Sequence, residues 1–381
     1  MRIGIDARFN RSPGVERYYN SLISNIAAID KENEYVVYYP SKKYLERHRI
    51  KQDNFTSILL PAYAYDPREQ FLLAYQIRKD RIDVFHSPNS WVTPLLCPCP
   101  LVVTIHDVCP KTHPELIKLK ARMYSLFMLP YSVRASDIIL TVSQYSKKEI
   151  IRFYPRAEEK IRVTYNGIEE VFRQKRDERD VRRIKEIYGI KGEYLLSVGA
   201  LMKHKNLLSL IQTYKQLPSS LKERCDLLIV GRMVPAHEDY VREVYEAVKG
   251  AQIKIVDFAE ERDLPLLYAG ATAFVFPSRQ EGFGTPLAEA MASGTPVISS
   301  NATVMPEICG EAAAYFDPGS IEDMKDTIER VLGSKTLMKE MSIKGLERSR
   351  AFSWAIAAQQ TLDAYRDVYR VKSSVMERRK G

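Results

Sequence analysis

The chain has 381 residues, of which 45% are hydrophobic and 28% are charged, a composition that excludes general disorder. Its length exceeds the size at which one hydrophobic core stops growing, so we expect two domains. The net charge of +9 is uneven, because residues 1–180 hold 29 Lys and Arg against 22 Asp and Glu, whereas residues 181–381 hold 28 against 26. A basic first half suits anionic partners, namely phosphates, nucleic acid or a membrane surface, but solubility alone is an equal explanation.

The cysteines and the first residues bear on the compartment. The five cysteines are odd in number and lack paired C-x-x-C spacing, so the sequence predicts neither a disulfide framework nor a zinc site. The opening MRIGIDARF contains Asp6 and Arg8, which interrupt any signal-like apolar region. No run approaches the roughly 18 apolar residues of a membrane span. We therefore expect a cytoplasmic protein.

Short β-rich runs alternate with helical stretches along the whole chain, which is typical of parallel sheets built from βαβ units. The clearest helix of the first half follows Gly14, where apolar residues recur at helical spacing up to Ile26. The strands predicted in this half are Arg2–Asp6, Tyr35–Tyr39, Thr56–Leu60, Asp83–His86, Leu101–His106, Ile138–Ser143 and Arg162–Tyr165.

The charge-rich segment 168–192 contains no predicted strand, so we place the domain boundary there. The alternation then restarts and predicts a second doubly wound domain. Two helical stretches follow, and Ser353 is a suitable N-cap for a last amphipathic run that reaches about Tyr369. The strands predicted in this half are Tyr194–Val198, Asp226–Val230, Lys254–Val256, Ala273–Phe276, Pro296–Ser299 and Ala313–Phe316.

The strongest local motif is EGFGTPLAE, from Glu281 to Glu289, which follows a predicted strand. Thr285 suits an N-cap, so a helix should begin there with its unpaired N–H groups facing the loop. Gly282 and Gly284 allow close approach of a ligand, and the helix N-terminus favours an anion such as a diphosphate. Glutamates before and within the helix can accept hydrogen bonds from sugar hydroxyls. The alternative is an ordinary capped helix with a surface carboxylate.

A second motif, VGALMKHKN, runs from Val198 to Asn206 and again joins a strand end, a loop and a helix start. Lys205 can neutralise phosphate charge, and Asn206 can cap the following helix. A solvated lysine is the alternative. Pairing of Lys205 with the Glu281 loop at the carboxyl ends of strands in one sheet, where α/β proteins bind ligands, favours the functional interpretation.

Two histidines follow strands of the first half. His106 stands beside Asp107 and can donate to a hydroxyl or share a proton at neutral pH, unless it is only a packed residue at the sheet edge. His86 resembles it, but we interpret it as part of a turn. The segment Lys111–Arg134 mixes basic and apolar residues between Pro114 and Pro130, and it predicts either a helix packed on its sheet or one lying on an anionic bilayer.

Taken in order, these motifs resemble the retaining glycosyltransferases of family 4, which have the two-domain GT-B fold. The resemblance spans nearly the whole chain, and its further matches are GVERY from Gly14, TIHD from Thr104, TVSQYS from Thr141, YNGI from Tyr165, and FSW from Phe352 at the start of the last helix. It implies two Rossmann-like domains facing a cleft, with the last helix crossing back. The domains would be 1–175 with 354–381, and 190–350.

The resemblance also implies roles for single residues. Glu281 would contact the transferred sugar, Glu289 the ribose, Lys205 the diphosphate, and His106 the sugar near the reacting carbon. The family often has an arginine after the glycine that matches Gly199, but this chain has Ala200 there. The donor site would therefore include, besides Glu281, Glu289 and Lys205, the residues Gly14, Gly199, Gly282, Phe283, Gly284, Thr285, Phe258 near the base, and Arg232 as a stand-in for the missing cation.

The activity that follows is metal-independent transfer of a hexose with retention, because the sequence contains no convincing Asp-x-Asp motif and Lys205 and the helix can stabilise the departing diphosphate. We expect no cofactor. The partners would be a nucleotide-diphosphate sugar, with GDP-mannose first and UDP-hexoses next, and a glycan or polyprenyl-linked acceptor. The alternatives are an epimerase or phosphorylase, a dehydrogenase, which the single Gly14 disfavours, a nucleic-acid binder, which lacks a recognisable module, and a non-catalytic sugar-nucleotide binding protein.

Overall fold

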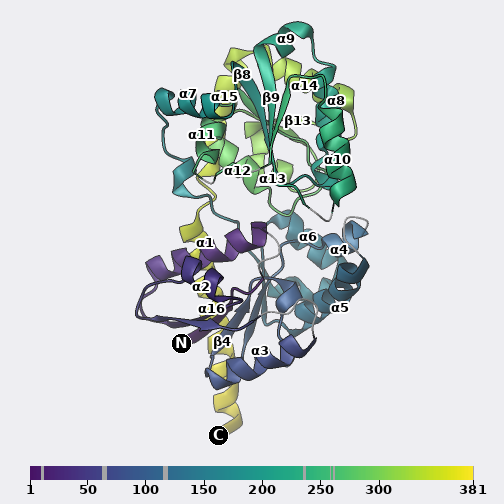
Figure 1. Cartoon of the computed structure of the whole chain (residues 1–381). Coiled ribbons are helices and arrows are strands. Elements are labelled where there is room, and N and C mark those ends of the chain that lie inside the picture. Colours follow the sequence, from purple (N-terminus) through teal and green to yellow (C-terminus); the bar gives the residue numbers. More distant parts are fainter. Residues whose placement is uncertain are drawn as a thin grey trace. The chain divides into compact units, whose positions relative to one another are not determined.

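The computed structural model describes residues 1–9, 13–61, 67–114, 119–234, 237–257, 259–260 and 262–380. The chain divides into two compact units, Met1–Gly167 with Ser353–Gly381, and Ile168–Phe352 (Figure 1). Phe258, which we expected near the base of the donor, lies outside the described residues.

The first unit contains a parallel sheet of seven strands in the order β3-β2-β1-β4-β5-β6-β7. The order reverses between β1 and β4, which makes the carboxyl ends of these two strands the topological switch point. Several runs, including β4 and β5, are buried along their whole length, as expected for strands covered on both faces. The strands are β1 (Arg2–Asp6), β2 (Glu34–Tyr39), β3 (Phe55–Leu59), β4 (Val84–Ser87), β5 (Leu101–Thr104), β6 (Ile138–Thr141) and β7 (Ile161–Val163).

Helices cover both faces of this sheet. The helix predicted after Gly14 is confirmed, and its apolar positions, including Tyr19 and Ile26, are buried. It packs against the last helix of the chain, which also contacts β4, β5 and β6. The described helices are α1 (Pro13–Ile29), α2 (Lys42–His48), α3 (Pro67–Lys79), η1 (Ser90–Val92), α4 (Cys109–Thr112), α5 (Leu119–Ala135), α6 (Gln144–Phe153), η3 (Pro155–Lys160) and α16 (Trp354–Lys380).

Three local predictions in this unit differ from the structure. The strands β5 and β6 end earlier than expected, so His106 lies in a loop and Ser143 is the N-cap of α6. Pro130 does not bound a helix but lies inside α5. The missing hydrogen bond and the proline ring cost about 3 kcal/mol, which burial of neighbours such as Leu129 and Val133 offsets.

The second unit contains a parallel sheet of six strands in the order β10-β9-β8-β11-β12-β13. Its order reverses between β8 and β11, which are neighbours in the sheet. The carboxyl ends of these two strands therefore form the switch point of this unit. The strands are β8 (Glu193–Val198), β9 (Cys225–Val230), β10 (Ile253–Val256), β11 (Ala273–Phe276), β12 (Val297–Ser300) and β13 (Ala313–Phe316).

Two groups of helices sandwich the second sheet: α8, α10 and α14 pack together, and so do α7, α11, α12 and α15 (Figure 1). This arrangement follows from right-handed crossovers on either side of the switch point. The described helices are η4 (Glu170–Phe172), α7 (Glu178–Ile187), η5 (Lys203–Lys205), α8 (Leu207–Lys215), α9 (Ser219–Arg224), α10 (Glu238–Ala247), α11 (Leu264–Ala269), α12 (Thr285–Ala292), α13 (Met305–Cys309), η7 (Gly310–Ala312), α14 (Ile321–Leu332) and α15 (Lys335–Ser349).

The charge-rich segment after Gly167 belongs to the second unit. The ring of Phe172 packs edge to face on that of Tyr268, with 5.8 Å between centroids. The guanidinium of Arg173 donates to the carbonyl oxygens of Ser349 and Phe352 at 3.0 and 2.8 Å. These contacts hold the segment to its unit and place the boundary at its start rather than in its middle.

Candidate active site

The two motifs that the sequence singled out meet at the switch point of the second unit. The Lys205 loop follows β8 and the Glu281 loop follows β11. The Lys205 ammonium lies 2.6 Å from Glu281 Oε1, and each side chain is 14% exposed. The prediction that these residues come together is therefore confirmed by the ion pair.

The side chain of Lys205 packs against Phe276 and Gly199. Its ammonium lies 5.4 Å from the centre of the Phe276 ring, a cation–π distance. Gly199 lies beside the lysine, because a Cβ added there would meet the outer atoms of the Lys205 side chain at 3.5–3.7 Å, an ordinary van der Waals contact. A Cβ at Gly231, which follows β9, would lie 2.0 Å from the Gly199 carbonyl oxygen, so only glycine fits there.

The Glu281 loop leads directly into α12, but the cap differs from the prediction. Gly284, with a φ of 77°, is the N-cap, and Thr285 is the first helical residue. As a glycine, Gly284 has no side chain that could cap this helix. Its first N–H groups therefore lack the usual side-chain acceptor, and Pro286 at the second position supplies no N–H at all. An uncapped helix N-terminus four residues after Glu281 suits an anionic ligand.

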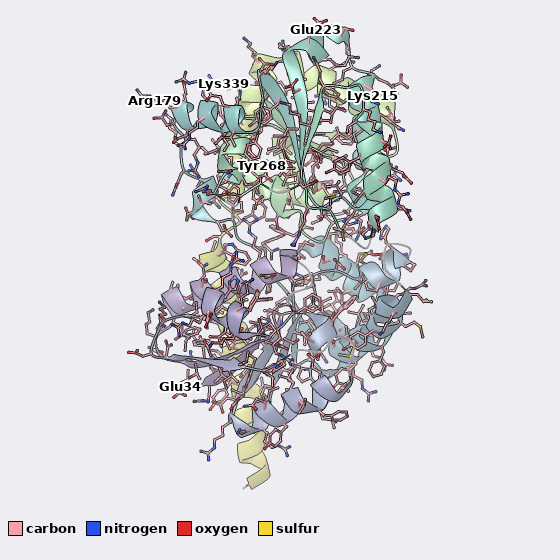
Figure 2. All side chains as sticks on the ribbon, viewed as in Figure 1. Glu34, Arg179, Lys215, Glu223, Tyr268 and Lys339 are labelled. Carbon is pink, nitrogen blue, oxygen red and sulfur yellow. The ribbon has the colours of Figure 1, made fainter. Side chains whose placement is uncertain are left out.

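Other residues of this motif point into the protein. The ring of Phe283 is buried edge to face on Phe352, which leaves its backbone as the part able to meet a ligand. Glu289 is 1% exposed, and its Oε2 accepts a hydrogen bond from the hydroxyl of Tyr268 at 3.0 Å. Figure 2 shows Tyr268 in the interior of the unit, whereas Arg179 and Glu223 lie at its periphery.

One polar prediction near Lys205 turns out differently. Asn206 does not cap α8 with its side chain, because its amide donates to the Pro318 carbonyl and its Oδ1 accepts from Ser209. Arg232 is exposed. Its backbone carbonyl accepts from the Leu201 amide at 3.0 Å, which joins the loops after β8 and β9.

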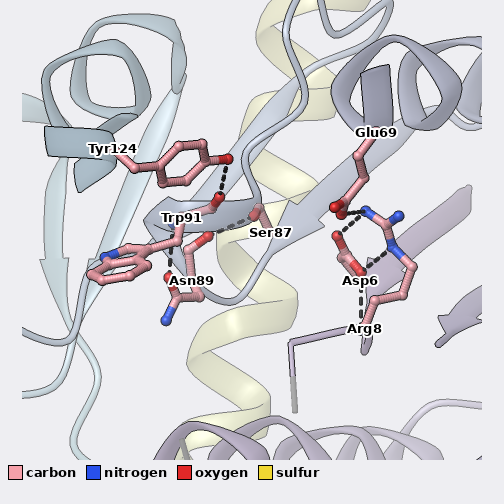
Figure 3. Close-up of polar contacts among 7 residues, drawn as sticks. All are labelled: Asp6, Arg8, Glu69, Ser87, Asn89, Trp91 and Tyr124. Carbon is pink, nitrogen blue, oxygen red and sulfur yellow. Dashed lines mark hydrogen bonds and ion pairs between the residues drawn. The ribbon is translucent and has the colours of Figure 1, made fainter. Parts of the chain in front are cut away.

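The switch point of the first unit holds a buried ionic cluster at the end of β1 (Figure 3). Arg8, whose side chain is 0% exposed, donates to both carboxylate oxygens of Asp6 and lies 3.2 Å from Glu69 Oε1. Burial alone would lower the pKa of Arg8, but the charge and hydrogen bonds of Asp6 outweigh it and raise that pKa. The cluster ties β1 to α3. Gly14 lies in the first turn of α1 rather than in a loop, and a Cβ there would meet nothing within 4 Å.

Beside this cluster, the loop after β4 is held by its own hydrogen bonds (Figure 3). The hydroxyl of Ser87 donates to the Asn89 carbonyl, and the side chain of Asn89 accepts from the Trp91 amide. The hydroxyl of Tyr124, from α5, donates to the Trp91 carbonyl at 3.0 Å. These bonds fix the backbone of the loop that contains Pro88.

His106 lies just beyond β5 and is held by that loop. Its Nε2 is 3.0 Å from the Pro88 carbonyl oxygen, which can only accept, so Nε2 carries the proton. Burial lowers the pKa of His106 to about 4, against the opposing effect of this hydrogen bond. The imidazole is therefore neutral at pH 7, with the lone pair on Nδ1. At neutral pH His106 can therefore accept a hydrogen bond from a hydroxyl at Nδ1, but it is not an imidazolium that could donate from both ring nitrogens.

Sequence reasoning missed the buried network next to His106. His86 is not a turn residue but lies in β4, 0% exposed, with Nδ1 2.6 Å from the Tyr365 hydroxyl and Nε2 2.8 Å from Thr104 Oγ1. The Tyr18 hydroxyl is 3.0 Å from the same Thr104 oxygen, and its ring packs edge to face on His106. Burial lowers the pKa of His86 to about 3. No local signal could reveal this network, since Tyr365 is 279 residues from His86.

Comparisons with known proteins agree with the two halves of this architecture. A family model described as "Glycosyltransferase Family 4" matches residues 13–171, and one described as "Glycosyl transferases group 1" matches residues 180–348. The O-antigen chain mannosyltransferase B of Escherichia coli is 30% identical over 315 residues, which cover 81% of this chain and 80% of that protein. The chain belongs to glycosyltransferase family 4. It is a glycosyltransferase, and the dehydrogenase, epimerase and nucleic-acid interpretations have no support in these matches.

Two further likenesses concern one long relative and one solved structure. The serotype-specific mannosyltransferase WbdA of Escherichia coli is 27% identical over 70% of this chain, which spans only 33% of that protein. The crystal structure of Anabaena Alr3699/HepE in complex with UDP-glucose matches with a TM-score of 0.77 at 18% identity, covering 98% of this chain and 100% of the other. The second likeness shows the fold, which is GT-B with two Rossmann-like units and α16 packed on the first.

In the described parts of the chain, no three or more His, Cys, Asp and Glu side chains are grouped so that they could hold a metal ion. No helix within the described ranges is both long and apolar enough to cross a bilayer.

Proposed function

We propose that this glycosyltransferase moves a hexose, mannose first, from a nucleotide-diphosphate sugar to a glycan or polyprenyl-linked acceptor in cell-surface polysaccharide synthesis. The observation that carries the proposal is the 2.6 Å pair of Lys205 and Glu281 at the switch point of one sheet, beside the uncapped N-terminus of α12. The names of the relatives, O-antigen chain mannosyltransferase B and WbdA, support mannose as the sugar.

In this proposal the donor diphosphate takes the place of Glu281 as the partner of Lys205. Two negative phosphates offer the ammonium a stronger interaction than one carboxylate does. The N–H groups of Gly284 and Thr285 then complete the phosphate site, together with the backbones of Gly282 and Phe283. Glu281, released from the ammonium, accepts hydrogen bonds from the sugar hydroxyls. Because these groups already supply positive charge to the leaving diphosphate, we propose that transfer needs no metal and no cofactor.

The chemistry that we propose retains the configuration of the anomeric carbon. The bond between that carbon and the diphosphate breaks, and the departing phosphate oxygen takes the proton of the acceptor hydroxyl as the new glycosidic bond forms. His106 would contribute as a neutral acceptor through Nδ1, which can hold a sugar hydroxyl but cannot deliver a proton near pH 7. Product NMR tests this step, because an inverted linkage would rule out the retaining course.

Further residues of both motifs and of the neighbouring loops would complete the donor site. Glu289 would bind the ribose diol once a hydrogen-bonded ligand competes with Tyr268 for its carboxylate. Gly14 and Gly199 would let the phosphates approach the backbone, and Arg232 would supply the second cation. GDP-mannose is our first choice of donor, and UDP-hexoses come next because HepE was solved with UDP-glucose.

The donor is identified most directly by thermal shift. A nucleotide sugar at about 100 times its dissociation constant raises the free energy of unfolding by roughly 2.7 kcal/mol. We expect GDP and GDP-mannose to stabilise the protein, and the Lys205→Met variant to lose this response. If no nucleoside diphosphate changes the melting temperature of the wild-type protein, the proposed donor site is wrong. Transfer of labelled mannose to an isolated glycan acceptor then tests the sugar. We propose that this reaction takes place in the cytoplasm, at the inner face of the membrane.

A further inference from the structure

The helix α5 bears large apolar residues on an exposed side as well as on its buried side. Its inner side packs on the sheet, where Met128, Leu129 and Val133 are buried. Its outer side also bears large apolar residues, because Leu119, Met123 and Phe127 are 71%, 65% and 60% exposed. A helix that is apolar all round is normally covered on both sides. In Figure 1, α5 lies at the edge of the first unit.

The exposed residues form one continuous stripe rather than scattered points. Leu119, Met123 and Phe127 are spaced four apart, so they lie one above the other along the helix. Leu126, which is 37% exposed, borders the same stripe. At about 100° per residue, these four side chains fall within an arc of roughly 100°, and the buried side chains of the helix all lie outside this arc.

A loop residue extends this stripe at a conformational cost. Leu96 is 78% exposed and has a φ of 58°, a left-handed conformation that is unfavourable for a bulky non-glycine residue. It is held there because its N–H donates to the Tyr131 hydroxyl at 3.0 Å, and this hydroxyl donates to the Pro94 carbonyl. The Tyr131 ring stacks on Phe127, which joins Leu96 to the helix.

The charges of α5 are of one sign. Its sequence contains Lys120, Arg122 and Arg134 and no acidic residue. On the helical projection Lys120 and Arg122 flank the apolar stripe on either side, and Arg134 lies at its far end. Basic residues that border an exposed apolar face are the pattern of a helix lying in the interface of an anionic bilayer. A docking face for a protein partner would be compatible with acidic residues as well as basic ones, whereas α5 has only basic ones.

We infer that the α5 face, made of Leu96, Leu119, Met123, Leu126 and Phe127, docks on a bilayer containing anionic phospholipids. The apolar side chains enter the boundary between headgroups and acyl chains, and the flanking cations meet lipid phosphates. This inference goes beyond the transfer reaction and rests on the proposed function only for its purpose, which is access to a lipid-linked acceptor.

The test compares two pairs of substitutions in the full-length protein. Met123→Gln with Phe127→Gln removes the centre of the stripe, and Ile343→Gln with Leu346→Gln removes two exposed apolar residues, 57% and 43% exposed, from α15 of the second unit. Each protein is sedimented with vesicles of phosphatidylcholine alone and of equal parts phosphatidylcholine and phosphatidylglycerol, at low and high salt.

We expect the wild-type protein to bind the phosphatidylglycerol vesicles, and to bind less at high salt. The α5 variant should lose about tenfold in binding, whereas the α15 variant should stay within twofold of wild type. Equal binding by the α5 variant, or no binding by the wild type, overturns the inference. So does a wild-type dimer in light scattering that the α5 variant converts to a monomer, since the face would then meet a second copy. Circular dichroism checks that both variants fold. Mannosyl transfer to a water-soluble acceptor should be unchanged in the α5 variant, so its loss would concern the proposed function instead.

Discussion

Substitution of Lys205 by methionine separates the contribution of the ion pair to stability from the contribution of the ammonium to transfer. Methionine keeps the length of the side chain and can pack on Phe276, so mainly the charge is lost. The carboxylate of Glu281, only 14% exposed, then lacks the ammonium that lay 2.6 Å from it. We expect a loss of about 2 kcal/mol, below the 3–5 kcal/mol typical of a fully buried pair because part of the surface meets water. For a unit of this size, that corresponds to roughly 4–8 °C in melting temperature.

The same substitution should impair transfer far more than folding. If Lys205 stabilises the leaving diphosphate, its loss resembles removal of one fixed group from an oxyanion site, which lowers kcat about 10²–10³-fold. The double variant Lys205→Met, Glu281→Gln then distinguishes the two effects. Because it carries no unpaired charge, it should recover most of the melting temperature while its kcat stays low.

The assay is release of nucleoside diphosphate from the donor, measured at a temperature where all variants are folded. A Lys205→Met protein with wild-type kcat/KM would refute the role of the ammonium. Additive effects of the two substitutions on the free energy of unfolding would refute the stability argument, since a true pair gives coupling in a double-mutant cycle.

Three other predictions concern the glycines, pH and the buried network. Gly231→Ala should unfold the protein or destabilise it by several kcal/mol in denaturant titration, because the new Cβ would lie 2.0 Å from a backbone carbonyl oxygen. Gly14→Ala should stay within about 0.5 kcal/mol of wild type, because a Cβ there meets nothing within 4 Å. Equal effects of the two substitutions would contradict the structure. Burial lowers the pKa of His86 to about 3 and that of His106 to about 4. The unfolded chain therefore binds more protons than the folded protein below about pH 6.5. Each histidine should thus lower the free energy of unfolding by about 2 kcal/mol as the pH falls from 7.5 to 5. Melting curves against pH should show this fall, and a His106→Gln protein whose curve is as steep as wild type would argue against it. Tyr365→Phe should lower kcat several-fold without raising KM for the donor, because the Tyr365 hydroxyl anchors His86, which reaches the ring of His106 through Thr104 and Tyr18. A change in melting temperature alone would mean a purely structural contact.

Much of the architecture is determined by the sequence itself. The alternation of buried strands with amphipathic helices is local, because a strand repeats every 2 residues and a helix every 3.6, and it predicted two parallel sheets whose strands the structure confirms to within a few residues. The positions of the Lys205 and Glu281 loops after strands of one sheet also followed from the chain order. The fold of such a sheet places these loops on one edge, so their meeting could be expected.

Local details at the same loops were not predictable in this way. Whether Thr285 or Gly284 caps α12 depends on the backbone conformation of the loop, and Asn206 gives its side chain to Pro318, which is 112 residues away. The burial of Glu289 depends on Tyr268, which lies in another helix. Motif spacing identifies the residue types but not the partners that compete for them.

Only the tertiary structure decided which residues surround His106 and which face of α5 remains uncovered. The link from Tyr365 to His86 spans 279 positions, and the stripe around Phe127 is apolar on a helix whose other side is apolar too. A periodic pattern records that a side chain is apolar or polar, but burial and hydrogen bonding depend on what the rest of the chain brings to it. For that reason the strands and helices can be predicted from the local sequence, whereas the protonation state of a histidine and the exposure of a leucine depend on how distant segments pack.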